Sequence, residues 1–248
     1  MFLEEGCLMA GFDRFVRTEL LIGADGLVRL ANSSVAVFGV GGVGSYAAAL
    51  ARSGVGKMTL IDHDRIDATN INRQIHALTQ TIGQTKTEVM KQRIQAINPA
   101  CEVVSMTAFY HPEHAARFFR SKYDYVVDAV DTVSAKIHLA IQCYERGIPI
   151  ISSMGAANKL DPTLFEVIDI YKTKADPLAR IMRKKLKEHR IPRLKVVCSR
   201  ERPHTDDRHT PHHRSVPGSI SFVPPVVGMI MAGEVIRDLV GVRVEVSA

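Results

Sequence analysis

A glycine-rich segment between an apolar run and an alanine-rich run has the residue types needed to bind a phosphate. It reads Gly39-Val40-Gly41-Gly42-Val43-Gly44, after the apolar run 35–38 and before the alanine-rich run 45–52. A tight turn between a strand and a helix lets backbone N–H groups approach a phosphate at the helix N-terminus. We therefore predict a nucleotide site that includes Gly39, Gly41, Gly42 and Gly44. This segment alone does not distinguish NAD, FAD and ATP.

An aspartate follows the next apolar run at the distance expected for ribose binding. Asp62 comes directly after residues 58–61 and lies 23 positions after Gly39. There its carboxylate can accept hydrogen bonds from ribose hydroxyls. A solvated aspartate at the end of a strand is the simpler alternative, but the position after the second strand favours ribose binding.

Further polar side chains exceed what a dinucleotide site requires. Arg73 and Lys86 could neutralise a triphosphate, and Asp131, which ends the segment YVVDAVD, could hold its magnesium ion. Each has a simpler explanation: a surface arginine, a solvated lysine, and an aspartate that caps a helix. Their joint occurrence favours ATP over hydride transfer. Besides the glycines, the expected nucleotide contacts are Asp62, Asp64, Asn70, Arg73, Gln74 and Lys86.

Strands and helices are predicted to alternate around these residues. We expect strands at 35–38, 58–61, 102–106, 125–130 and 148–152, and helices at 45–52, 85–97, 112–121 and 134–146. Thr85 and Glu88 have the spacing of a capping box at the start of the second helix. This alternation predicts a Rossmann-like α/β fold with a doubly wound, mostly parallel sheet. Short helices at 12–32 should precede it, and a β segment at 164–171 and a final helix after Pro225 should follow.

Composition limits the classes of protein to consider. The 248 residues are 46% hydrophobic and 23% charged, which is ordinary for a globular protein. The four cysteines form no C-x-x-C pair, which argues against a zinc site or a disulfide framework and fits a reducing cytoplasm. The N-terminus lacks the basic start of a secretory signal. The uncharged stretch 215–233 contains three prolines, and its dense apolar part is far shorter than the roughly 20 residues of a membrane span. We expect a cytoplasmic protein.

Basic charge is concentrated in one part of the chain. Residues 180–214 hold twelve Lys and Arg against four Asp and Glu, a balance of +8, whereas the whole chain carries +6. A localised basic segment suggests a polyanionic partner, although most charge runs are simply solvated. Within it, Ile181, Met182 and Leu186 are expected to dock a helix while its cations face solvent. The expected contacts to the polyanion are Arg183, Lys184, Lys185, Lys187 and Arg190.

The order and spacing of five short motifs resemble a known superfamily. GVGGVGS, LIDHDRID, TNINRQ, GQTK and DAVDT are similar to motifs of the ubiquitin-activating-enzyme-like adenylyltransferases, which include the HesA, MoeB and ThiF proteins. The resemblance covers about residues 12–155. It implies that Asp62 binds ribose, that Asn70, Arg73 and Lys86 bind phosphates, and that Asp131 binds Mg²⁺.

The same resemblance implies a homodimer. Arg14, in DRFVRTELLIG, is similar to an arginine that reaches the neighbouring subunit's ATP site, although an exposed helix arginine is a serious alternative. The implied catalytic residues are Arg14, Arg73, Lys86 and Asp131. We expect one adenylating domain over residues 1–248, with a nucleotide-binding core at 12–155 and a substrate-binding part at 156–248. A mobile basic loop is expected near 203–216.

The second half of the chain indicates the subfamily. Residues 161–202 and GSISFVPPVVGMIMAGEVIRDL resemble the bacterial tRNA threonylcarbamoyladenosine dehydratases. The implied reaction uses ATP to activate the threonyl carboxylate of the modified tRNA as an acyl-adenylate. An atom of the same side chain then expels AMP, which closes a ring with net loss of water.

Two other functions stay open. The chain could adenylate the C-terminus of a small sulfur-carrier protein, although such enzymes usually carry two C-x-x-C pairs that are missing here, or it could be a non-catalytic nucleotide sensor. A sulfur-acceptor protein is a further partner to consider, since relatives can use a cysteine covalently. For Cys198, which follows the apolar residues LKVV, a buried structural thiol is the preferred interpretation. The histidine-rich stretch 205–214 lacks an accompanying zinc-ligand set, so a solvated loop is expected.

Overall fold

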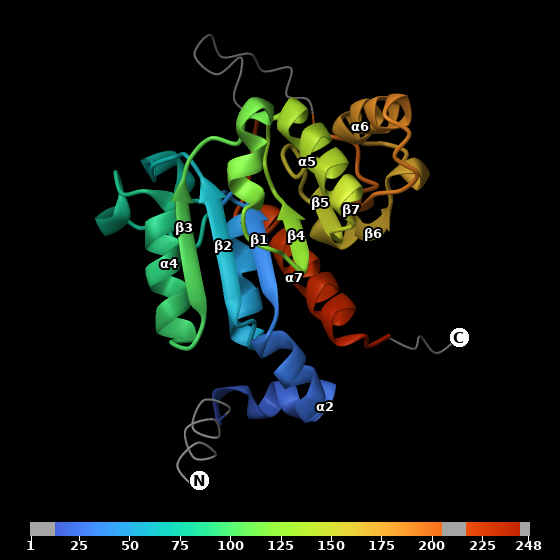
Figure 1. Ribbon diagram of the computed structural model, residues 1–248. Helices are drawn as coiled ribbons and strands as arrows, with labels where there is room; N and C mark the ends of the chain where they lie inside the picture. The colour runs from blue at the N-terminus through green and yellow to red at the C-terminus, as the bar shows by residue number, and fades with distance from the viewer. Residues whose placement is uncertain (1–12, 205–216, 244–248) are drawn as a thin grey trace, which may run out of the picture.

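One seven-stranded sheet organises the protein. The structure, a computed structural model, describes residues 13–204 and 217–243. Within them the strand order is β3-β2-β1-β4-β5-β7-β6, as Figure 1 shows. Neighbouring strands run parallel except β6 and β7, which pair antiparallel with Phe165 opposite Ser199. The expected Rossmann-like, doubly wound, mostly parallel sheet is confirmed.

The strands agree closely with the apolar runs of the sequence. Their bounds are β1 Ser34–Phe38, β2 Lys57–Asp62, β3 Glu102–Thr107, β4 Tyr125–Asp128, β5 Ile150–Ser153, β6 Phe165–Asp169 and β7 Lys195–Ser199. The α-helices are α2 Val16–Ala31, α3 Gly44–Ala47, α4 Lys86–Ile97, α5 Val133–Arg146, α6 Pro177–Glu188 and α7 Pro224–Val240. The two strands of the second half, β7 and β6, extend the sheet that the first half begins.

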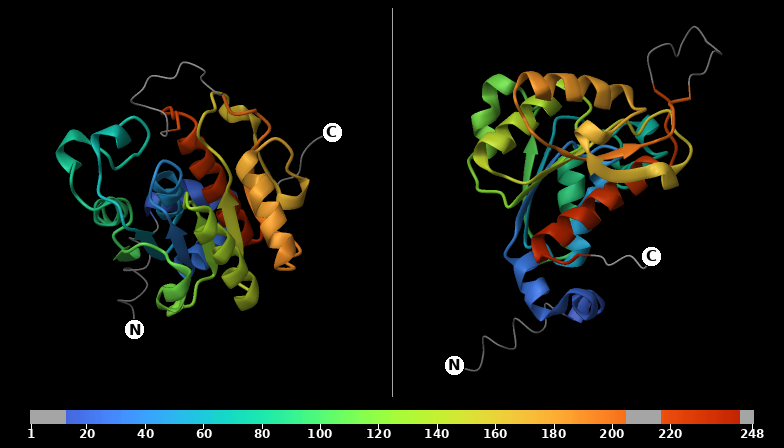
Figure 2. Two further views of the ribbon diagram at one scale, coloured as in Figure 1. Left: turned by 90° about the horizontal axis from the view of Figure 1, so that it is seen from above. Right: turned by 90° about the vertical axis from the view of Figure 1, so that its right-hand side faces the viewer.

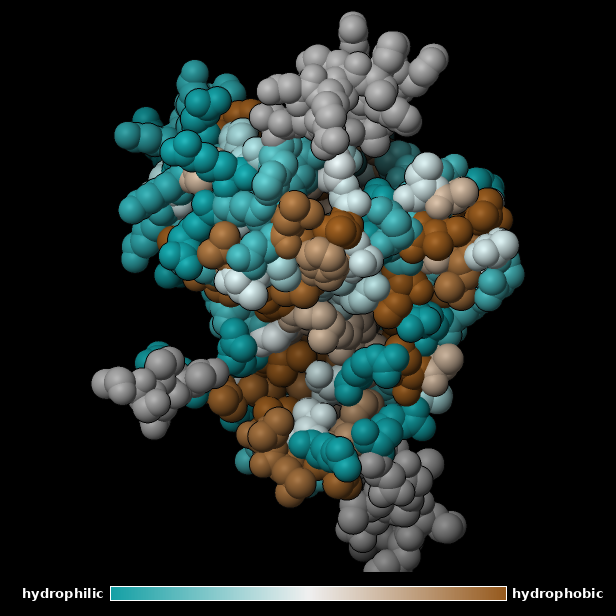
Figure 3. Space-filling view, turned by 180° about the vertical axis from the view of Figure 1, so that it is seen from behind, coloured by the Kyte–Doolittle hydropathy of each residue, from teal (hydrophilic) through white to brown (hydrophobic). Residues whose placement is uncertain are grey.

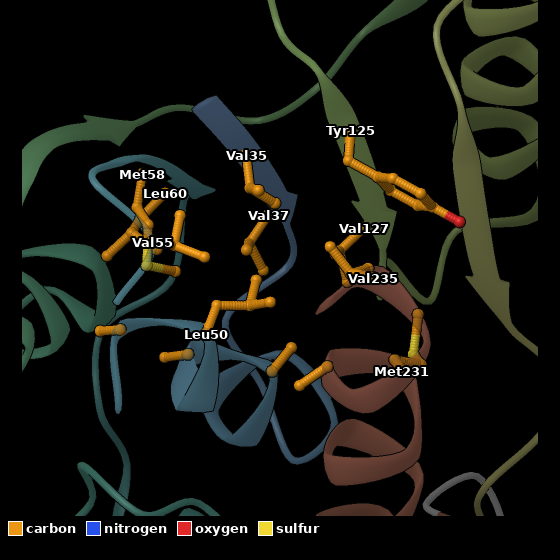
Figure 4. Packing of buried hydrophobic residues seen from close by; sticks show 14 of the residues in the cluster. Val35, Val37, Leu50, Val55, Met58, Leu60, Tyr125, Val127, Met231 and Val235 are labelled. Carbon is orange, nitrogen blue, oxygen red and sulfur yellow. The ribbon is translucent and has the colours of Figure 1, made fainter. Parts of the chain in front are cut away.

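Helices cover both faces of the sheet. Side chains alternate along β1, so Val35 and Val37 pack against the layer of α4 and α7, while Ala36 and Phe38 pack against the layer of α5. Figure 4 shows the first of these cores, with Leu50 lying beneath β1. The second layer continues over β7, where α6 packs on α5 (Figure 2). Because β1 is covered on both faces, its sequence is continuously apolar rather than alternating.

Three expected helical features differ in the structure. The helix at 45–52 is one α-turn, α3, followed by the 3-10 helix η2, Ala48–Ser53, which Gly54 ends with a φ of 98°. The segment 112–121 forms the 3-10 helix η5, Pro112–Phe119. The capping box at Thr85 is wrong, because the Thr85 side chain makes no capping hydrogen bond. Instead, the Thr85 backbone forms an antiparallel bridge with Arg65, which fixes the entry to α4 by main-chain pairing.

The N-terminal helix α2 lies at the opposite edge of the sheet from the strand ends that carry the predicted site (Figure 1). It kinks at Gly23, which has a φ of 74°, and its last turns are buried through Leu27 and Leu30. Among the helices that the structure describes, none is both long enough and apolar enough to cross a membrane.

Two glycines of α7 differ in the space around them, and this difference predicts opposite effects of one substitution. A Cβ at Gly228 would lie 2.2 Å from the Val43 carbonyl oxygen, because α7 crosses α3 at that point. We expect Gly228→Ala to lower the free energy of unfolding by about 1–3 kcal/mol, the usual cost of overpacking. Urea unfolding followed by circular dichroism measures this change.

The matched control is Gly233→Ala in the same helix. A Cβ at Gly233 would meet only the Arg237 guanidinium, at 3.6 Å. This substitution should raise the free energy of unfolding by about 0.5–1 kcal/mol, because alanine favours a helix over glycine. Equal effects of the two substitutions would contradict the described contact between α7 and α3.

Candidate active site

A cleft of about 990 Å³ opens at the carboxyl ends of the parallel strands. Its walls come from the loops that follow β1, β2, β4 and β5. β1 and β4 are neighbours whose following connections go to opposite sides, and open α/β sheets bind ligands at such a point. The cleft is lined by all the predicted nucleotide contacts except Gly44, namely Gly39, Gly41, Gly42, Asp62, Asp64, Asn70, Arg73, Gln74 and Lys86, and also by Asp131.

The glycine turn packs closely on itself and on the end of β4 because Gly39 and Gly44 have no side chains. Gly39 has a φ of 84°, and a Cβ there would lie 2.5 Å from the Ala129 carbonyl oxygen. A Cβ at Gly44 would lie 1.8 Å from the Gly39 carbonyl oxygen, so Gly44 closes the turn from beneath and does not line the cleft. At these positions the close approach of the backbone requires glycine.

Asp62 connects the end of β2 to the glycine turn. One carboxylate oxygen accepts a hydrogen bond from the Val40 N–H at 2.7 Å, and the other accepts one from the Asp64 N–H at 2.8 Å. These bonds orient the carboxylate beside the turn. Each oxygen has a further lone pair, which leaves Asp62 able to accept hydrogen bonds from a ligand hydroxyl.

Lys86 is buried in the first turn of α4, and its ammonium lies 2.6 Å from a carboxylate oxygen of Asp64. The interpretation of Lys86 as a solvated lysine is therefore wrong. A buried cation needs a partner, and Asp64 supplies one at the wall of the cleft. A phosphate in the cleft would be a second partner for the same ammonium.

The loop that follows β2 folds over the same wall. Asn70 accepts a hydrogen bond from the Asp67 N–H in the short helix η3, Ala68–Asn70. The Arg73 guanidinium donates to the Thr69 carbonyl oxygen at 2.9 Å and to the Asn72 side chain at 2.8 Å. Gln74 is buried, and its Oε1 has no hydrogen-bond partner among the described residues. This wall thus brings one guanidinium and one buried amide to the cleft.

His76 was not identified from the sequence. It is fully buried behind this wall, and neither ring nitrogen has a hydrogen-bond partner in the described part of the chain. Burial, together with the nearby charges of Lys86 and Arg93, lowers the pKa of His76 to about 4. The imidazole is therefore neutral at pH 7 and adds no charge to the site. In the sequence His76 is an isolated histidine outside the predicted strands and helices, and nothing beside it indicates that it is buried.

Asp131 lies exposed in the turn between β4 and α5. Its carboxylate accepts one long hydrogen bond, 3.3 Å from the Thr132 hydroxyl, and α5 has no side-chain cap. The interpretation of Asp131 as a helix cap is therefore wrong. An unencumbered carboxylate in the cleft suits a hard divalent cation, which prefers oxygen ligands.

A buried ion pair beneath this turn was also missed. Lys136 and Asp128 are both fully buried, with Nζ and Oδ2 3.1 Å apart. Lys136 also donates to the Val130 carbonyl oxygen, and the Val130 N–H donates to Asp128, so the pair holds the turn that carries Asp131. The sequence did indicate this burial, because Lys136 has the spacing that puts it on the apolar face of the helix with Leu139 and Cys143.

Arg14 does not line the cleft. It lies in η1, Asp13–Phe15, and its guanidinium donates to the Ile97 carbonyl oxygen at 2.8 Å. Within one chain Arg14 is therefore at the opposite edge of the sheet, and a role at the ATP site requires a second subunit.

The basic helix α6 is only partly as expected. Its buried stripe is Ala179, Met182 and Leu186, while Ile181 is exposed, because it lies about 100° around the helix from Met182. Arg183 is half-buried and donates to the Thr173 carbonyl oxygen at 3.0 Å, so it does not face solvent freely. The exposed cations include Arg180, which was not among the predicted contacts, and the predicted Lys184, Lys185, which pairs with Glu188, and Lys187. Arg190, just beyond the helix, is exposed too.

Cys198 is a buried thiol in β7. Burial raises the pKa of Cys198 to about 12, and the carboxylate of Asp176 contributes in the same direction. The thiol is therefore protonated at neutral pH, which does not suit a nucleophile. The expected mobile loop near 203–216 and the histidine-rich stretch 205–214 lie almost entirely outside the described residues.

Three comparisons place the chain among known proteins. The ThiF family profile matches residues 13–247. A tRNA threonylcarbamoyladenosine dehydratase of Bacillus subtilis is 50% identical over 239 residues, which cover 91% of this chain and 94% of the relative. The dehydratase of the same name from Escherichia coli is 45% identical over 175 residues, 70% of this chain and 65% of the relative.

A solved structure matches a larger share of this chain than the E. coli sequence comparison does. The crystal structure of E. coli tRNA N6-threonylcarbamoyladenosine dehydratase in complex with ATP superposes with a TM-score of 0.86 at 36% identity, covering 94% of this chain and 96% of that one. The mixed α/β fold described above agrees with this match. The chain belongs to the ThiF family.

Proposed function

We propose that this protein is an ATP-dependent dehydratase that cyclises threonylcarbamoyladenosine in tRNA through an acyl-adenylate. The observation that carries the proposal is the single cleft that unites the glycine turn, Asp62, Lys86 and Asp131 in a chain whose 50% identity to a named dehydratase spans 91% of its length. ATP is the nucleotide that the cleft fits, because it combines a phosphate turn with two cations and a free carboxylate.

In the first step the residues of the cleft position and neutralise ATP. Backbone N–H groups of the glycine turn and the cations of Arg73 and Lys86 bind phosphate oxygens, and Asp62 accepts from the ribose. The threonyl carboxylate attacks the α-phosphorus, a new P–O bond forms, the bond to the bridging oxygen breaks, and pyrophosphate leaves. Catalysis here consists of orientation and charge stabilisation, so no enzyme nucleophile is needed.

Mg²⁺ is the second expected cofactor, and Asp131 is the residue that would hold it. Its carboxylate is exposed to the cleft and accepts one hydrogen bond, from Thr132, within the described residues. Bound there, the ion would neutralise charge on the triphosphate. The Lys136–Asp128 pair would keep the carboxylate in place.

In the second step an atom of the same threonylcarbamoyl side chain attacks the acyl carbon. A bond to that carbon forms, the bond to the AMP oxygen breaks, and AMP leaves. Because the attack is intramolecular, it needs no thioester to the enzyme. The high pKa of Cys198 supports this route and gives no support to a sulfur-acceptor partner at that thiol.

A homodimer would complete the site. Leu20 and Leu21 of α2 are 83% and 82% exposed, and Val16 beside them is also exposed. Apolar atoms gather over the end of the molecule where α2 lies (Figure 3). A second subunit that covers this surface would remove it from water and could receive Arg14 at its ATP site. We propose a single catalytic domain that works as such a dimer.

The test of the function is product formation with and without modified tRNA. With tRNA that carries threonylcarbamoyladenosine, we expect one AMP and one pyrophosphate for each cyclised nucleoside. Asp131→Ala should lower kcat by about 100-fold or more, because a metal ligand and its effect on transition-state charge are removed. The control, Glu145→Ala, removes an exposed carboxylate near the end of α5 and should be neutral.

The two alternative functions, a sulfur-carrier activator and a nucleotide sensor, predict different results in the same assay. Pyrophosphate release that depends on a small protein ending in Gly-Gly, and not on tRNA, would indicate a sulfur-carrier activator. ATP binding without pyrophosphate release would indicate a sensor. Near-normal turnover of Asp131→Ala at saturating Mg²⁺ and ATP would remove Asp131 from the mechanism.

Complementation tests whether Arg14 acts across the dimer. Arg14→Ala and Asp131→Ala should each be nearly inactive alone. In mixed dimers one of the two sites combines an intact Asp131 with an intact Arg14, so part of the activity should return. Light scattering and native mass spectrometry verify that mixed dimers form. If they form and remain inactive, Arg14 does not contribute to the neighbouring site.

Salt dependence tests the basic helix α6 as the tRNA-binding surface. Lys184→Glu, Lys185→Glu and Lys187→Glu together should weaken tRNA binding and make the log–log salt slope shallower. The change should be roughly 0.7–0.9 for each phosphate that the helix no longer neutralises. Arg183 is left unchanged because Thr173 already holds it. ATP affinity should be unaffected.

The matched control for charge replaces Lys57, Lys91 and Lys122, three lysines outside α6, with glutamate. It changes the net charge by the same amount, so any general electrostatic effect appears in both proteins. If the two triple variants bind tRNA equally and with the same salt slope, the docking surface does not include α6.

A further inference from the structure

A second buried ion pair forms part of the cleft wall, and the proposed chemistry leaves it without a role. The Lys159 ammonium lies 3.2 Å from Oδ2 of Asp176, and both side chains are only 1% exposed. Removing two charges from water is costly, and apolar residues of similar volume are often at least as stabilising. A pair retained at this cost suggests a task other than stability.

The pair joins the loop after β5 to the start of α6. Lys159 also donates to the Gly155 carbonyl oxygen, directly after β5. Asp176 uses its other oxygen, Oδ1, to accept the Ala179 N–H at 2.8 Å, which caps the first turn of α6. Thus one ammonium connects the end of a central strand to the start of the basic helix.

The pair leaves no free space at Gly155. A Cβ at this position would lie 2.7 Å from Oδ2 of Asp176 and 3.5 Å from the Lys159 ammonium. The glycine therefore allows the carboxylate to lie directly against the backbone that follows β5. Gly155, Lys159 and Asp176 all line the cleft, together with Pro177 and Leu178 of α6.

Apolar packing alone does not fix α6 along its axis. Ala179, Met182 and Leu186 hold the helix against α5 and β7. Burial of apolar area is non-directional, so it determines which face of the helix is covered more strongly than where the first turn lies. A capped first turn connected to β5 by hydrogen bonds has one preferred position. Figure 2 shows α6 lying along α5.

We infer that Lys159 and Asp176 are a positioning pair that sets the distance between the basic helix α6 and the nucleotide cleft. The inference rests on the proposed function for its tRNA part. A tRNA held by the cations of α6 must place its modified nucleoside beside the α-phosphate of ATP. With a displaced helix the tRNA could not contact the cations of α6 and place its nucleoside in the cleft at the same time, so productive binding of tRNA would weaken.

The test is a double variant, Lys159→Met with Asp176→Asn. Met fills similar space, and Asn keeps an oxygen that can cap Ala179, so neither an unpaired buried charge nor an uncapped helix remains. We expect the free energy of unfolding to stay close to that of the parent. The KM for modified tRNA should rise about tenfold, while the KM for ATP changes less than about twofold, since coupling between neighbouring groups has this size.

Lys159→Met alone separates stability from positioning. It leaves Asp176 buried without its partner and should lower the free energy of unfolding as well as raise the KM for tRNA. Loss of folded enzyme alone lowers the apparent kcat and leaves KM unchanged, so the rise in KM reports the positioning. Lys57→Met is the matched control, because it breaks an exposed pair with Glu102 and should alter neither constant. A double variant with the parent's KM for tRNA would overturn the inference and leave the pair a purely structural one.

A second measurement keeps the inference testable if the proposed function fails. Hydrogen exchange at the Ala179 amide, in the first turn of α6, should be faster in the double variant, because the side chain that caps it is no longer tied to the loop after β5 by the Lys159 ammonium. The amides around Leu186 should keep their protection. Unchanged exchange at Ala179 would overturn the positioning role. If the parent makes no AMP with modified tRNA but exchange changes as expected, the dehydratase proposal fails and the structural link stands.

Discussion

The close approach of the glycine turn to the end of β4 is the constraint around which the cleft is built. Gly39 lies against the Ala129 backbone, and Gly44 lies against Gly39, with no space for a side chain at either point. The ends of β1 and β4 are therefore held together at the place where their connections separate. From there the backbone N–H groups lie on one side of the opening and Asp131 on the other. Asp62 and the buried Lys136–Asp128 pair each secure one of these sides.

The sequence predicts the parts of the fold that depend on neighbouring residues. Strands such as 35–38 are short apolar runs bounded by turn residues, and the structure has them within one or two positions. The site residues around 62, 73, 86 and 131 were predicted because their types and order suit a triphosphate, and the cleft contains them. Whether each binds ATP as expected remains a prediction, as does the single domain over residues 1–248.

The features that were not predicted from the sequence depend on contacts between residues that are far apart along the chain. Thr85 has the spacing of a capping residue, but an antiparallel bridge with Arg65 determines its geometry. Arg183 belongs to a run of cations, yet Thr173 holds it. Lys159 resembles any loop lysine until Asp176 is seen beside it. No local periodicity distinguishes such residues, because the partner lies elsewhere in the chain and only the folded sheet brings the two together.

The order of strands at the β5 edge has a consequence for how the chain folds. β6, residues 165–169, is made before β7, residues 195–199, yet β7 lies between β5 and β6. One edge of β5 pairs with β4. The other edge has no partner until about 45 further residues, which include β7, have been synthesised. During that interval the nascent chain carries an open parallel edge, which other chains can pair with. A chain that ends between these two strands would be an aggregation-prone fragment, whereas a chain that includes β7 would have both edges of β5 paired.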